Sequence, residues 1–150
     1  MHAEAVNPSC KRVRGITQMP YILLIEDNQQ NADMVIHILQ SIGREVKLFL
    51  RGLEGVQYAR KERPDLILLD FDLPDIDGRT LILTLKKQLG GQAAPPIVAV
   101  TARTGHMEMK IAERFGCSAF IGKPFTPEQL IKVVQRLTNH SQETNQPPTP

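Results

Sequence analysis

The sequence predicts an α/β fold in which a mostly parallel sheet is covered by helices on both faces. Five short, largely apolar runs alternate with five amphipathic segments between residues 20 and 138. Short connections between alternating strands and helices are typical of parallel strands joined by helical crossovers. Three of the runs are apolar almost throughout, as expected for strands that are buried on both faces.

The predicted strands differ in how deeply we expect them to be buried. The near-continuous apolar runs are Tyr21–Ile25, Asp65–Leu69 and Ile97–Val100. Glu45–Leu50 instead alternates polar and apolar residues, which favours a position nearer an edge of the sheet. The fifth strand, Ser118–Ile121, is short.

The helices are predicted from apolar residues at helical spacing and from the residues that end them. The first, Asn31–Ile42, places Met34, Val35, Ile38, Leu39 and Ile42 on one face and is closed by Gly43. The others are predicted at Leu53–Lys61, Arg79–Leu89, Gly105–Phe115 and Pro127–Leu137. A single folded domain at residues 20–138 follows from this pattern.

Both ends of the chain lack such a pattern. Residues 1–19 show neither the helical nor the strand period of apolar residues, so we expect a flexible leader. Met19 stands directly before the first residues that we expect to be folded. Residues 139–150 are polar and proline-rich, which predicts a disordered tail. Because these twelve residues leave no room for a further domain, we expect a stand-alone domain.

Composition excludes several function classes. The chain is 41% hydrophobic and 23% charged, which is ordinary for a soluble domain, and its net charge of +2 gives no basis for nucleic-acid binding. The apolar runs are far shorter than a membrane span. Two cysteines, Cys10 and Cys117, without a secretory signal favour a reduced, cytoplasmic protein.

Acidic residues gather where two neighbouring strands are predicted to end. Glu26 and Asp27 follow the first strand, and Asp70 follows the third. In a parallel sheet, ligands bind at the carboxyl ends of the strands, where these carboxylates would converge. Three close carboxylates repel one another unless a cation joins them, and Mg²⁺ takes such oxygen ligands. The alternative for any single residue is a helix cap.

Two further residues, at the ends of the fourth and fifth strands, suit a phosphoryl group. Thr101 offers a hydroxyl and Lys123 an ammonium group. Both can donate hydrogen bonds to phosphoryl oxygens.

With these residues in place, the chain resembles the receiver domain of two-component response regulators over residues 20–138. The matching segments are ILLIEDN (22–28), DLILLDFDLPDIDG (65–78), VAVTA (98–102) and GKPF (122–125). The resemblance implies a flavodoxin-like, doubly wound fold with five helices and a five-stranded parallel sheet of order 2-1-3-4-5.

The resemblance also implies roles for the acidic residues. Asp70 would be the phosphoacceptor, attacking a phosphohistidine to form an acyl phosphate. Asp27 and Asp70 would bind Mg²⁺ directly, Glu26 would hold it through water, and the backbone carbonyl of Asp72 would be a further ligand.

The same resemblance assigns the residues opposite the acids. Lys123 would contact the phosphoryl group, and Thr101 would move to hydrogen-bond it. Phe120 stands where the family keeps a switch aromatic, although it lacks the hydroxyl of the usual Tyr; the alternative is a core residue. The Lys123–Pro124 bond would be cis.

Ala102 and Arg103 would flank the site. Arg103 and Asp72 carry opposite charges at positions that influence hydrolysis of the phosphoryl group in this family. They would pair across the mouth of the site and slow hydrolysis, or they would be two solvated charges.

We therefore predict a non-enzymatic response regulator that accepts a phosphoryl group from a sensor histidine kinase or a histidine phosphotransfer protein. Output would pass to a downstream protein by contact or by onward phosphotransfer, from a monomer or a weak phosphorylation-linked dimer. One alternative is a receiver-fold binding module that works without phosphorylation. Another is a small Mg²⁺-dependent phosphatase with Asp72 as acid–base, although no connection is long enough for its substrate cap.

Overall fold

Five parallel strands form one sheet in a computed structural model of the chain, which describes residues 11–13, 16–18, 20–102 and 105–143. The strands are β3 (Ile22–Ile25), β4 (Val46–Phe49), β5 (Leu66–Leu69), β6 (Ile97–Thr101) and β7 (Ala119–Gly122). They lie side by side in the order β4-β3-β5-β6-β7, every pair parallel. Counted along this sheet alone, that is the predicted order 2-1-3-4-5, with the alternating strand β4 at one edge.

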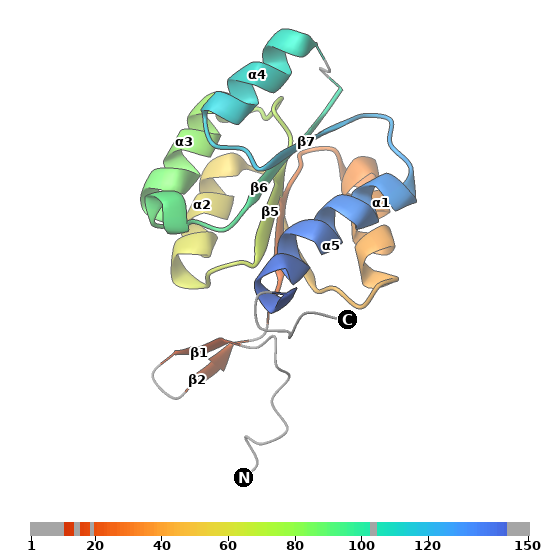
Figure 1. Ribbon diagram of the computed structural model, residues 1–150. Helices are drawn as coiled ribbons and strands as arrows, with labels where there is room; N and C mark the ends of the chain where they lie inside the picture. The colour runs from red at the N-terminus through yellow and green to blue at the C-terminus, as the bar shows by residue number, and fades with distance from the viewer. Residues whose placement is uncertain (1–10, 14–15, 19, 103–104, 144–150) are drawn as a thin grey trace.

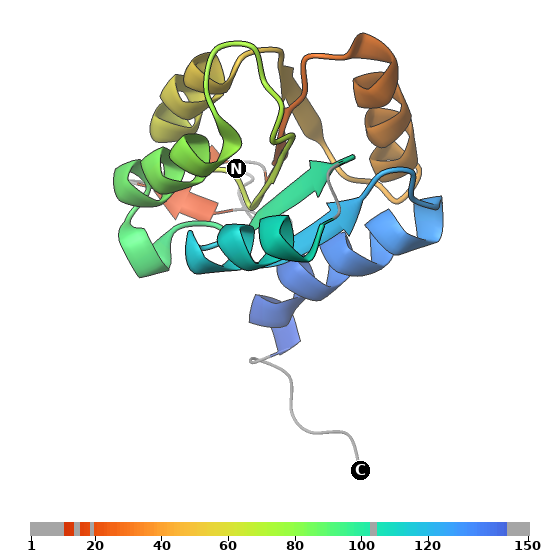
Figure 2. The ribbon, with the colours of Figure 1, turned by 90° about the horizontal axis from the view of Figure 1, so that it is seen from above.

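Helices cover both faces of this sheet (Figure 1, Figure 2). They are α1 (Gln29–Gln40), α2 (Gly52–Lys61), α3 (Gly78–Gln88), α4 (His106–Arg114) and α5 (Pro127–Glu143), with a short 3₁₀ turn at Gly91–Ala93. Helices α1 and α5 pack on one face, and α2, α3 and α4 lie on the other. The predicted fold class is confirmed.

The core is split by the sheet into two layers. Along β3, Ile22 and Leu24 pack toward α1 and α5, whereas Leu23 and Ile25 pack toward α2 and α3. Successive side chains of a strand point to opposite faces, so a strand covered on both faces must be apolar at every position. This two-sided burial explains the near-continuous apolar runs of the central strands.

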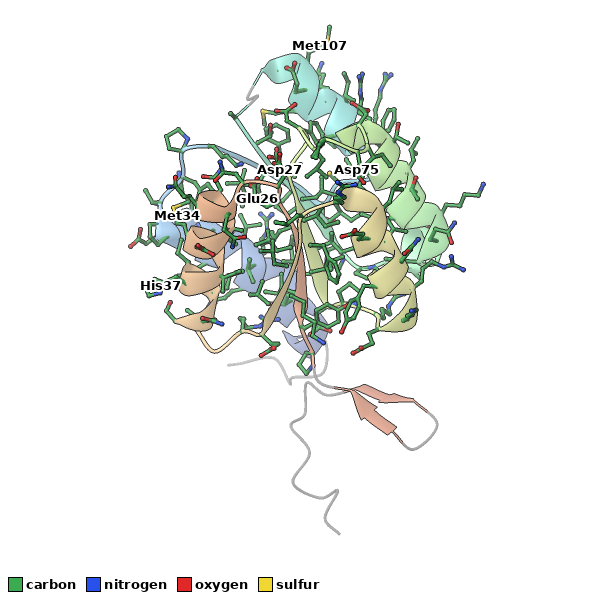
Figure 3. All side chains as sticks on the ribbon, turned by 180° about the vertical axis from the view of Figure 1, so that it is seen from behind. Glu26, Asp27, Met34, His37, Asp75 and Met107 are labelled. Atoms are coloured by element: carbon green, nitrogen blue, oxygen red, sulfur yellow. The ribbon has the colours of Figure 1, made fainter. Side chains whose placement is uncertain are left out.

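The face of helix α1 differs in part from the prediction. The helix begins two residues earlier, at Gln29, because the Asn28 side chain accepts a hydrogen bond from the Asn31 amide and caps it. Val35, Ile38 and Leu39 are buried as expected, but Met34 is 44% exposed. The apolar stripe is therefore narrower than the sequence suggests, and Met34 is available at the surface (Figure 3).

Parts of both ends of the chain form regular structure. Helix α5 continues beyond Leu137 to Glu143, because no proline or glycine interrupts the sequence there. Residues 11–13 and 16–18 form an antiparallel pair, β1 and β2, apart from the main sheet (Figure 1). Strands of three residues are too short for an alternating pattern to predict. Among the described residues, no helix combines the length and apolar character needed to cross a membrane.

Candidate functional site

Three carboxylates meet at the carboxyl edge of the sheet. Glu26 and Asp27 follow β3 (Figure 3), and Asp70 follows the neighbouring strand β5. One oxygen from each of the three residues lies within 4.8 Å of the others. Glu26 and Asp70 are only 3% and 7% exposed, whereas Asp27 is open to solvent. The predicted cluster is therefore a half-buried acidic site with one open side.

Lys123 enters this site from the connection between β7 and α5. Its Nζ donates a hydrogen bond of 2.9 Å to Glu26 Oε1 and lies 3.5 Å from Asp70 Oδ2. The other Glu26 oxygen, Oε2, accepts a hydrogen bond from the Asn28 amide at 3.2 Å. Both oxygens of Glu26 are thus engaged, and Glu26 holds the lysine beside Asp70.

Burial and neighbouring charge act together on the ionisable groups. Burial raises the pKa of Glu26, and the nearby Asp70 carboxylate raises it further, against the lowering effect of hydrogen bonds from Lys123 and Asn28. Burial alone would lower the pKa of Lys123, but its hydrogen bond to Glu26 and the charge of Asp70 raise the pKa overall. The site therefore keeps the Lys123 ammonium group charged and disfavours ionisation of Glu26.

The donor set fits a hard divalent cation. Three carboxylates face one ammonium group, so among the described residues the ionised site carries two negative charges in excess. Oxygen ligands on an open, partly hydrated edge are what Mg²⁺ prefers. Asp27 is open to solvent at this edge, whereas Lys123 already contacts both Glu26 and Asp70.

The remaining predicted residues lie around this centre. Thr101 ends β6 in a fully buried position, and its carbonyl accepts a hydrogen bond of 2.8 Å from the Lys123 amide. Ala102 follows at the surface. Asp72 is exposed, and its backbone amide donates to Asp70 Oδ1 at 3.1 Å. Arg103 lies outside the described residues.

Phe120 is half-buried on β7 and contacts the site through a second aromatic residue. Its ring packs edge-on against that of Phe71, with centroids 6.1 Å apart and planes at 85°. Phe71 directly follows Asp70 in the chain. The Phe120 side chain therefore contacts the loop that begins at Asp70, rather than being buried in either core layer. The Lys123–Pro124 peptide bond is cis.

Two residues near the site escaped the sequence analysis. Phe71 was not recognised because an aromatic residue after a strand has no distinctive spacing. Asp75 was not recognised because its partners, the Gly52 and Leu53 amides, belong to another part of the chain. The only available signal was that Arg51 is a poor residue for capping the helix that follows it.

Comparison with known proteins gives the family. The model of the response regulator receiver domain matches residues 22–135. The polar-differentiation response regulator DivK of Brucella anthropi is 31% identical over 114 residues, which are 76% of this chain and 92% of DivK. The chain belongs to the response regulator receiver domain family.

Other relatives are longer than this chain. The hybrid signal transduction histidine kinase G of Dictyostelium discoideum is 37% identical over 80% of the chain, but this match spans only 4% of the kinase. The transcriptional regulatory protein CreB of Escherichia coli is 33% identical over 87% of the chain and 56% of CreB. The chain thus corresponds to one domain of these proteins.

A solved structure agrees with the fold. The receiver domain of the sensor histidine kinase PA1611 from Pseudomonas aeruginosa superimposes with a TM-score of 0.73 at 32% identity. The match covers 80% of this chain and 98% of that domain. The PA1611 structure has a magnesium ion coordinated in its active-site cleft.

Proposed function

We propose that the chain accepts a phosphoryl group on Asp70 from a phosphohistidine of a sensor histidine kinase or a histidine phosphotransfer protein. A carboxylate oxygen of Asp70 forms a bond to phosphorus while the phosphorus–nitrogen bond of the donor breaks. The imidazole leaves with the electron pair and takes up a proton from solvent. The product is an acyl phosphate on Asp70.

The observation that carries this proposal is the shared lysine. Lys123 lies 2.9 Å from Glu26 Oε1 and 3.5 Å from Asp70 Oδ2, so its charge is held where a phosphoryl group on Asp70 would carry negative charge. The Thr101 hydroxyl would donate a hydrogen bond to the same group.

Mg²⁺ belongs to this proposal. Asp27 and Asp70 would hold the ion, with Glu26 acting through water and the Asp72 carbonyl as a further ligand. When bound, the ion would neutralise charge on the phosphoryl oxygens. The unbalanced acidic charge of the site and the magnesium ion in the PA1611 receiver domain support this assignment.

The readout proposed for phosphorylation is a change in the surface around Phe120. Movement of Thr101 toward the phosphoryl group would vacate space into which the Phe120 ring could turn, breaking its edge contact with Phe71. Arg103, paired with Asp72, would slow hydrolysis of the acyl phosphate on Asp70.

The signal would then pass to a downstream protein by contact or by onward transfer of the phosphoryl group. A cytoplasmic location is part of this proposal, in keeping with the free thiol of Cys117.

Incubation with acetyl phosphate tests the chemistry without a known kinase. We expect one phosphoryl group on the wild-type chain with Mg²⁺, and no adduct after chelation or in Asp27→Asn. Turnover of a generic phosphomonoester would instead support the phosphatase alternative, with Asp72 as acid–base. No adduct under any condition, beside a working control receiver, would favour a binding module independent of phosphorylation.

A further inference from the structure

Helix α2 has an unusual cap at its N-terminus. The first amides of a helix have no partner within it, and the residue before the helix commonly supplies one. Here that residue is Arg51, whose side chain makes no capping hydrogen bond. Instead the Asp75 carboxylate accepts from the Gly52 amide through Oδ1 and from the Leu53 amide through Oδ2, both at 3.0 Å. The cap therefore comes from the loop that follows β5.

This loop is the one that begins at the acidic site. An antiparallel bridge pairs Asp72 with Asp77 and closes the loop around residues 73–76. At its start, the Asp72 amide donates to Asp70 Oδ1 at 3.1 Å. At its end, Asp77 caps its own helix, α3, by accepting from the Arg79 and Thr80 amides. Asp75 is thus the residue in this loop whose side chain accepts hydrogen bonds from α2.

Packing fixes the same junction. Gly52 is buried, and a Cβ atom at this position would come within 2.4 Å of Ile76 Cγ2 and 3.2 Å of Leu81 Cδ2. The helix end and the loop are therefore in direct contact at a point with no spare volume. Two hydrogen bonds to the charged Asp75 carboxylate also fix the orientation of the loop relative to the end of the helix.

We propose that Asp75 is a positioning residue for the phosphoacceptor, which holds the Asp72 amide on Asp70 by anchoring their loop to helix α2. The chain of contacts runs from the α2 amides through Asp75 and the closed loop to Asp70 Oδ1. The inference rests on the function proposed above for Asp70, and it adds a residue on the α2 side of the site (Figure 3).

The test compares Asp75→Ala with Asp77→Ala by amide NMR of the full chain. Each variant removes one carboxylate cap from the same loop, but only the Asp75 cap reaches α2. We expect the Asp72 amide proton to exchange faster in Asp75→Ala and unchanged in Asp77→Ala. Asp75→Asn, which keeps one acceptor oxygen, should fall between wild type and Asp75→Ala.

Titration with Mg²⁺ alone gives the second readout. Loss of outer-shell partners commonly weakens metal sites by 10–100-fold, and for this more distant anchor we expect a rise in dissociation constant of about three- to tenfold in Asp75→Ala. Asp77→Ala should bind as wild type does. The proposal would be overturned if Asp75→Ala were destabilised but kept both the wild-type Mg²⁺ affinity and the wild-type exchange rate of the Asp72 amide proton. Asp75 would then be a helix cap only.

The two proposals fail separately. If the wild-type chain binds no Mg²⁺, the proposed function fails at its metal. Faster exchange of the Asp72 amide in Asp75→Ala would still support the link between Asp75 and Asp70, and unchanged exchange would overturn it.

Discussion

Two lysine–glutamate pairs in this molecule have the same chemistry but differ in burial and in the charges around them. At the carboxyl edge of the sheet, Lys123 contacts Glu26 at 2.9 Å and also faces Asp70, and the glutamate side chain is 5% exposed. At the edge strand β4, Lys47 lies 3.7 Å from Glu62, and the two side chains are 35% and 45% exposed. The first pair is tight and buried, and the second is looser and open.

The second pair is completed by aromatic residues. Lys47 donates a hydrogen bond of 2.5 Å to the Tyr58 hydroxyl, which donates to Glu62 Oε2 at 2.8 Å. Its ammonium group also lies 5.0 Å from the ring centroids of both Tyr21 and Tyr58. The Tyr21 hydroxyl donates in turn to the Glu62 carbonyl. One ammonium group faces one carboxylate here, and the chain supplies the other contacts itself.

The difference between the pairs is one of charge balance. Among the described residues around Lys123 the acids outnumber the cation, so the site can gain from a further positive ion. Around Lys47 the charges balance and the aromatic rings complete the contacts, so the cluster serves packing between β4 and α2. A lysine–glutamate contact alone therefore does not distinguish the two clusters, whereas their charge balance does.

The largest expected difference between the two regions is in the phosphorylation rate after each lysine is replaced by methionine. Lys123→Met should slow phosphorylation by acetyl phosphate by about 10²- to 10³-fold, the usual cost of removing one preorganised donor to developing charge. Lys47→Met should be phosphorylated at the wild-type rate. Intact-mass time courses at saturating Mg²⁺ measure both, and equal slowing in the two variants would mean that the effect is general destabilisation.

Magnesium should distinguish the two regions by stability. At a concentration of 100 times its dissociation constant, a ligand that binds only the folded state adds about 2.7 kcal/mol to the free energy of unfolding. We expect this gain in the wild type and in Glu62→Gln, but not in Asp27→Asn. Urea unfolding with and without Mg²⁺ measures it. An undiminished gain in Asp27→Asn would place the ion elsewhere.

The Tyr58 hydroxyl should matter for stability and not for phosphorylation. Tyr58→Phe removes the group that bridges Lys47 and Glu62, and loss of such hydrogen bonds typically costs about 1 kcal/mol of unfolding free energy. Chemical unfolding followed by circular dichroism measures the loss, with phosphorylation as the control. A slower phosphorylation of the folded variant would contradict the separation of the two regions.

The smallest expected effect is a pH dependence of the Lys47 cluster. The hydrogen bond with Tyr58 raises the pKa of Lys47 above 10.5, against the opposing effect of burial. A raised folded pKa contributes stability that is complete below the unfolded pKa and is lost as pH rises through the folded value.

The difference in unfolding free energy between wild type and Lys47→Met isolates this contribution. It should be constant near neutral pH and should shrink as the pH rises beyond 10.5. A difference that grows with pH over this range would mean that the Lys47 ammonium group is disfavoured in the folded chain.

Much of the fold could be predicted from local pattern. The strands β3, β5 and β6 were visible because burial on two faces requires apolar residues at consecutive positions. The convergence of Glu26, Asp27 and Asp70 followed from the rule that parallel strands end at one edge. These features depend on residue order within short segments.

Features that depend on contacts between distant segments could not be predicted. Asp75 caps a helix that begins 23 residues earlier in the chain, since its partner is the Gly52 amide. Lys47 and Tyr58 are ordinary residues of a strand and a helix until packing brings them together. Met34 is 44% exposed although it lies one helical turn before the buried Ile38, so the period of α1 alone does not predict its exposure.

The most direct test of the account is the intact mass of wild type and Asp70→Asn after incubation with acetyl phosphate and Mg²⁺. We expect one added phosphoryl group on the wild-type chain and none on Asp70→Asn, because Asp70 is the acid that Lys123 faces beside Glu26. The same adduct on Asp70→Asn would contradict Asp70 as the phosphoacceptor. A wild-type chain that stays unmodified beside a working control receiver would contradict the phosphoryl-accepting role itself.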